Sequence, residues 1–136
     1  MTVRLRYKLD IAVSSNSNED KDLGHPVSEV VVDSQGEGGV FKTTLPASAT
    51  DQEIKLDNIA DAKFLALRVA TVSAQDTLPT ISVKRNAVGG EAVDIAPLSG
   101  ASEAHFLITT TGLTALYATN PDASVSVELT VVMAGD

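Results

Sequence analysis

The chain has no cysteine and no tryptophan, and aromatic residues make up only 4% of its 136 residues. The absence of cysteine excludes a disulfide framework, thiol catalysis and a cysteine-bound zinc site. The scarcity of aromatic rings leaves few platforms for stacking a sugar, which weakens the case for a glycosidase built on paired carboxylates. We therefore expect a protein that is not an enzyme and that needs no cofactor.

Long apolar runs are also absent. Basic residues near the amino terminus alternate with apolar ones, so we expect neither a secretory signal nor a membrane-spanning helix. Lysine and arginine number 10 against 18 aspartate and glutamate residues, for a formal net charge of −8. Proteins that bind nucleic acid concentrate positive charge, so we expect no nucleic-acid partner. Because we expect no signal and no membrane-spanning helix, we also expect no membrane partner and folding in the cytoplasm.

The apolar residues that are present, 43% of the chain, suit one globular domain over residues 1–136. Residues 2–13 show the clearest pattern, because apolar and polar residues alternate there without a break. Successive strand residues point to opposite faces, so this stretch predicts a strand with one apolar face that packs against an opposing sheet. The apolar positions are Val3, Leu5, Tyr7, Leu9, Ile11 and Val13.

Residues 124–133 alternate in the same way, and shorter apolar segments separated by turn residues lie between. The pattern predicts an all-β fold, a two-sheet antiparallel sandwich that is jelly-roll-like, with nine or ten strands. Residues 58–69 could instead carry a helical stripe, but we favour a central strand. The intervening strands are expected at 27–33, 40–44, 53–56, 64–73, 80–85, 91–96, 104–110 and 115–119.

Three details of this prediction concern individual side chains. In residues 91–96, Val93 and Ile95 should face inward. In residues 104–110, Phe106 and Ile108 should face away from His105 and Leu107. The turn at residues 86–90 ends in two glycines, which can adopt the positive φ that tight hairpins need.

Residues 14–26 have no periodicity and are rich in turn-forming residues, so they predict a loop. Oxygen-bearing side chains alternate within it, as in a calcium loop, but Lys21 stands where such a loop needs glycine. A solvated acidic loop is the better interpretation, and we expect no metal site. His25 should lie in this loop and His105 on a strand face. The alternating residues are Asn16, Asn18, Asp20 and Asp22.

Arg4, Arg6 and Lys8 occupy the polar face of the first predicted strand. An ordinary solvated face explains them. The alternative is an interface in which three aligned cations meet an acidic neighbour, such as another copy of this acidic chain, and set the register of an assembly.

The second half of the chain resembles small β-sandwich proteins of tailed-phage virions, namely capsid decoration proteins and minor head or tail components. The segments that carry the likeness are 57–59, 64–69, 106–113, 116–120 and the closing alternating strand. This resemblance implies a structural protein bound to the capsid or tail, commonly a homotrimer, that is assembled in the host cytoplasm and located in the virion.

These observations favour a non-enzymatic virion protein, either a capsid decoration (cement) or a minor capsid protein. Its expected partners are the major capsid protein or another virion protein, together with copies of itself. The alternative is a carbohydrate- or surface-binding sandwich module that uses the loop at residues 14–26. A hydrolase is the third hypothesis, because acidic residues are common in the chain.

Overall fold

The computed structural model describes residues 3–8, 12–14, 20–22, 29–34, 38–56, 59–98 and 101–135, with side chains described from residue 38 onward. Every regular element among these residues is a β-strand, and all neighbouring strands pair antiparallel. The predicted all-β fold is therefore confirmed. Twelve strands occur in the described residues, more than the nine or ten expected.

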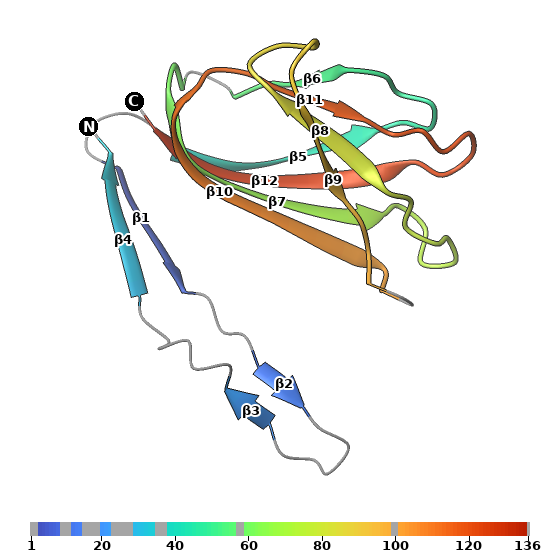
Figure 1. The fold of residues 1–136 in the computed structure, drawn as a ribbon, viewed down its shortest axis with the longest axis horizontal. Coiled ribbons are helices and arrows are strands. Elements are labelled where there is room, and N and C mark those ends of the chain that lie inside the picture. Colours follow the sequence, from blue (N-terminus) through green and yellow to red (C-terminus); the bar gives the residue numbers. More distant parts are fainter. Residues whose placement is uncertain are drawn as a thin grey trace.

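Two four-stranded sheets form the body of the protein (Figure 1). The first sheet has the order β10 (Glu103–Leu113), β7 (Ala62–Thr71), β12 (Val127–Gly135) and β5 (Gly38–Leu45). The second sheet has the order β6 (Gln52–Ile54), β11 (Leu116–Thr119), β8 (Ile81–Arg85) and β9 (Ala92–Ile95). The segment at residues 64–73 is thus a central strand, as predicted, and not a helix.

The core lies between the two sheets and is almost entirely aliphatic. Alternate residues of β7 and β12 are fully buried and meet alternate residues of β8 and β11. Each such side chain contributes about 1.5–3 kcal/mol when it is removed from water. The two-sheet sandwich is therefore confirmed, whereas the jelly-roll connectivity stays a prediction. Central members of the core are Leu65, Leu67, Val69, Leu129, Val131, Ile81, Val83 and Leu116.

The amino-terminal strand differs from the expectation. The described residues of the strand predicted at 2–13 do not join the sandwich, because β1 (Val3–Lys8) pairs with β4 (Glu29–Ser34) in a separate two-stranded sheet. Beyond it, β2 (Ala12–Ser14) pairs with β3 (Asp20–Asp22), so part of the predicted loop at residues 14–26 is a strand. Figure 1 shows these two small sheets extending away from the sandwich. The predicted packing of the first strand's apolar face concerns side chains outside those described.

Val93 and Ile95 face inward, as predicted, because the strand register sets them opposite the buried Val83 and Ile81. Val93 is nevertheless 45% exposed, since β9 is an edge strand of the second sheet. One smaller prediction is wrong. In the turn after β8, the positive φ belongs to Asn86, at 63°, and not to a glycine. Phe106 and Ile108 do face the core, opposite to His105 and Leu107, as expected.

Candidate functional site

The outer face of the first sheet carries a row of apolar side chains that crosses all four strands. The strand register aligns Leu107 with Ala66, Ala66 with Val132, and Val132 with Val40. Directly opposite residues on antiparallel strands share one face, so these four side chains form one strip, which we call the apolar row. Val40 is 68% exposed and Leu107 is 46% exposed. The row therefore presents apolar surface to the surroundings.

A shallow hollow of about 390 Å³ lies over this row between β10, β7 and β12. Its lining is mostly apolar and includes Ala66, Leu107 and Val132. Thr130 also lines it, and the Thr130 hydroxyl oxygen is buried without a hydrogen-bond partner among the described residues. Arg68 and His105 complete the polar part of the lining, and the exposed surface of the hollow is mainly apolar.

Charged side chains border the apolar row on one side and pair with one another. Lys42 Nζ lies 3.4 Å from a Glu128 carboxylate oxygen. Arg68 donates from Nε to Glu103 Oε2, and His105 Nε2 lies 3.7 Å from that oxygen. These exposed pairs contribute little to stability. They leave the border of the row close to neutral, although the whole chain is strongly acidic.

The ion pair at the border affects the titration of Glu103. Arg68 donates a hydrogen bond to the Glu103 carboxylate and places positive charge beside it, and both effects hold the pKa of Glu103 below its usual range. Glu103 therefore stays ionised at neutral pH.

The prediction that His105 lies on a strand face is confirmed, since its side chain is exposed.

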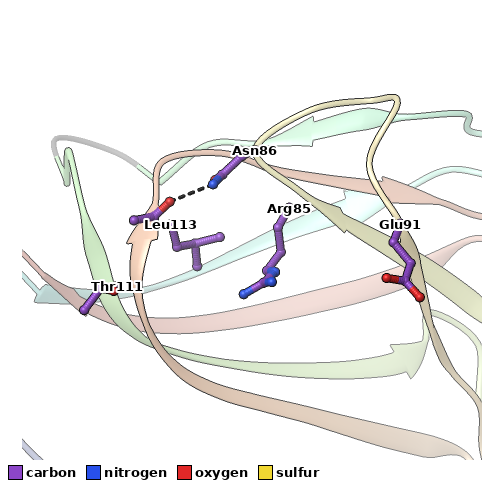
Figure 2. Close-up of a pocket in the computed structure, with 6 residues that line it drawn as sticks. Arg85, Asn86, Glu91, Thr111 and Leu113 are labelled. Carbon is purple, nitrogen blue, oxygen red and sulfur yellow. Dashed lines mark hydrogen bonds between the residues drawn. The ribbon is translucent and has the colours of Figure 1, made fainter.

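A second hollow, of about 230 Å³, lies where the end of β8 faces the end of β10. Figure 2 shows the Arg85 side chain reaching into it, with Glu91 on one side and Thr111 on the other. Arg85 forms no ion pair within the part of the chain whose side chains are described. The hollow thus presents one guanidinium, that of Arg85, and one carboxylate, that of Glu91.

Asn86 holds the rim of this hollow in place. Its Nδ2 donates to the Gly112 carbonyl oxygen at 2.7 Å, and its Oδ1 accepts from the Thr114 backbone N–H at 2.8 Å. On the other side, the Gly112 N–H donates to Asp61 Oδ1 at 2.6 Å. Gly112 has a φ of 74°, which only glycine adopts readily, so these bonds fix the bend between β10 and β11. Asn86 acts here as a structural clamp.

The predicted interface residues Arg4, Arg6 and Lys8 all lie on β1. The backbone register places Arg4 opposite Asp33, and Lys8 opposite Glu29, on β4 of the same hairpin. Acidic positions thus occur opposite two of the three cations within the same chain. Whether the three side chains form an interface with another molecule stays a prediction.

The other predicted site residues are spread between described and undescribed parts of the chain. Asn16, Asn18 and His25 lie outside the described residues, whereas Asp20 and Asp22 are the two ends of β3. Among the residues that the structure describes, no group of three or more histidine, aspartate or glutamate side chains is placed to hold a metal ion.

Sequence reasoning missed the apolar row, although a signal for it was present. Val132 and Leu107 are apolar residues at positions where the alternation of β12 and β10 calls for polar ones. Each such residue alone is unremarkable on a protein surface. Only the strand register shows that the two residues lie on one line together with Val40 and Ala66.

None of the described residues forms a helix with the length and apolar character that a membrane crossing requires. Comparison of this chain with protein-family models, with curated protein sequences and with solved structures finds no match.

Proposed function

We propose that this chain is a non-enzymatic structural protein of a phage virion, a capsid decoration or minor capsid protein that binds neighbouring virion subunits. The observation that carries the proposal is the apolar row of Val40, Val132, Ala66 and Leu107 on the outer face of the first sheet. A solvent-facing apolar strip across a whole sheet is unfavourable for an isolated molecule and favourable for one that docks.

The border of the row supports docking on protein. Lys42 is paired with Glu128, and Arg68 with Glu103, so the border of the row carries little net charge. Another subunit can therefore approach this acidic chain here with little electrostatic repulsion. The virion as the setting rests on the resemblance of the second half of the chain to tailed-phage virion proteins.

The decisive experiment is mass spectrometry of virus particles purified from a culture that produces this protein. We expect the chain to be present in these particles in many copies. Its absence from purified particles would contradict the proposal. A chain that is absent from particles but binds sugars on a glycan array would support the carbohydrate-binding alternative.

Rebinding to particles tests the docking surface. Particles stripped of the protein should bind Val40→Lys and Val132→Lys at least tenfold more weakly than the wild-type chain, because each variant buries a lysine in an apolar contact. Val72→Lys is the matched control, since Val72 is 63% exposed and lies outside the row. Equal binding by all three variants would show that another surface docks.

A further inference from the structure

The sandwich has four edge strands, and three of them carry features that discourage pairing with another chain. An edge strand exposes unpaired N–H and C=O groups, and native proteins protect such edges by short length or by charge. β6 has three residues, including Glu53, and β9 has four, including Asp94. β5 carries Lys42 within its length.

β10 is the fourth edge strand; a bulge interrupts it after Thr109, but the regular part before the bulge lacks these protections. It is eleven residues long, and among the described residues it pairs with β7 alone. It contains no lysine, arginine or proline, and its one carboxylate, that of Glu103, stands at its first position. Its middle, residues 106–111, consists of apolar and threonine residues that favour strand pairing. A long edge of this kind is a template for another strand.

Apolar surface lies on both faces of this edge. The hollow over the apolar row reaches Phe106 and Leu107 on the outer side. On the side toward β9, another hollow of about 310 Å³ has an apolar part formed by Val83, Val93, Phe106 and Ile108, and Arg85 and Glu91 also line it. A strand added beside β10 would cover the exposed parts of Leu107 and Val93 at the same time.

We propose that two copies of this chain pair antiparallel through β10 and thereby join their first sheets into one continuous eight-stranded sheet. The pairing is centred on Leu107, which faces the partner subunit's Leu107, while Phe106 faces the partner subunit's Ile108. With this register, His105 faces the partner subunit's Thr109, and the regular pairing ends at the bulge that follows Thr109.

The sequence of β10 favours a second copy as the occupant and favours this register. No like charges face each other, and every residue from 106 to 108 meets an apolar residue. If the pairing were centred on Phe106, Leu107 would face the partner subunit's His105. If it were centred on Ile108, Leu107 would face the partner subunit's Thr109. The chain carries a net charge of −8, so two copies repel each other in general, whereas this edge is nearly free of charge.

A strand that pairs with itself about a two-fold axis closes at two copies. This edge therefore yields a dimer rather than the trimer that the resemblance to virion proteins implies. The inference does not rest on the proposed virion function, because it concerns the free protein. Particle binding and dimerisation are measured in separate experiments, so either proposal can be refuted while the other stands.

The absence of cysteine allows a direct test with single-cysteine variants of the full chain. Leu107→Cys should form a disulfide-linked dimer under mild oxidation at micromolar protein, because the two-fold axis brings position 107 of each copy together. Val72→Cys has a similarly exposed position away from β10, and it should stay monomeric on a non-reducing gel. Equal crosslinking of the two variants, or none at position 107, would overturn the proposal.

Charge substitutions supply a second, non-covalent test by sedimentation and light scattering. The wild-type chain should be a dimer, while Leu107→Lys and Leu107→Glu should each weaken dimerisation at least tenfold, because like charges then face each other. An equimolar mixture of the two variants should recover the dimer. Thermal melts should confirm that both variants fold, since Leu107 is on the surface. A wild-type monomer or trimer, or a mixture that stays monomeric, would refute the pairing.

Discussion

Replacing Asn120 with alanine tests whether one buried amide joins the two loops at one end of the sandwich. Asn120 is the one polar residue that is fully buried in the described part of the chain. Its Nδ2 donates to the carbonyl oxygens of Pro46, at 3.1 Å, and Val125, at 2.8 Å. Its Oδ1 accepts from the Asp122 backbone N–H at 3.1 Å. The loop after β5 and the loop after β11 thus meet at this side chain.

Alanine removes all three of these hydrogen bonds. The Val125 carbonyl oxygen and the Asp122 N–H lose this partner, whereas the Pro46 carbonyl oxygen still accepts from the Ala49 N–H at 3.3 Å. Each polar group left unpaired away from water costs about 1–3 kcal/mol, and neighbouring losses are not additive. The bond from the Asn120 backbone N–H to the Ala49 carbonyl oxygen, at 2.9 Å, remains. We expect the free energy of unfolding to fall by about 3 kcal/mol, which corresponds to a Tm lower by roughly 10 °C.

The measurement is urea unfolding followed by far-UV circular dichroism, because the chain has no tryptophan to report by fluorescence. Ser124→Ala is the control in the same turn, and it should change stability by less than about 0.5 kcal/mol because its hydroxyl is exposed. A loss below about 1 kcal/mol for Asn120→Ala would show that other contacts hold these loops together.

Three further predictions concern single positions. Thr130→Val replaces a buried hydroxyl that has no partner among the described residues, so stability in urea should rise by about 1 kcal/mol, and a loss would reveal a partner. Gly135→Ala sets a Cβ against the backbone of Asp61 and should lower stability by about 1–3 kcal/mol, whereas Gly89→Ala, where no described atom lies within 4 Å, should lower it little or not at all. Asp122 accepts hydrogen bonds from two following backbone N–H groups, which lower its pKa from 3.8. Its contribution to stability is therefore present above pH 3.8 and is lost as the pH falls through the lower folded-state value, so Asp122→Asn should flatten the acid side of a plot of Tm against pH.

The fold was largely predictable because a period of two reports which residues share a strand face. It placed β7, β8, β10 and β12 within a few residues of their observed bounds. The same pattern misplaced the first strand, since alternation shows that a strand has an apolar face but does not show which strand lies beside it. The period also placed Val93 on the inward face, but it could not show that a position on an edge strand leaves this side chain 45% exposed.

The candidate site was harder to predict than the fold. The apolar row takes one residue from each of four strands, and Val40 and Leu107 come from opposite edges of the sheet. Their alignment depends on three registers, which are fixed by packing and turn geometry rather than by local sequence. Arg4, Arg6 and Lys8 were proposed as interface residues because they share one face of a single predicted strand. The pattern within one segment can reveal only residues that lie together on that segment.

The position of β12 in the middle of the first sheet has a consequence for how the protein folds. β5 precedes β12 by most of the described chain, and the two strands are neighbours only after the intervening segments have been made. Bringing the two strands together costs the entropy of closing this long loop before their contacts can form. We therefore expect folding to be slow, on the order of milliseconds to seconds. Until β12 arrives, β5 and β7 each lack a neighbour, so newly synthesised chains depend most on dilution or chaperones during that interval.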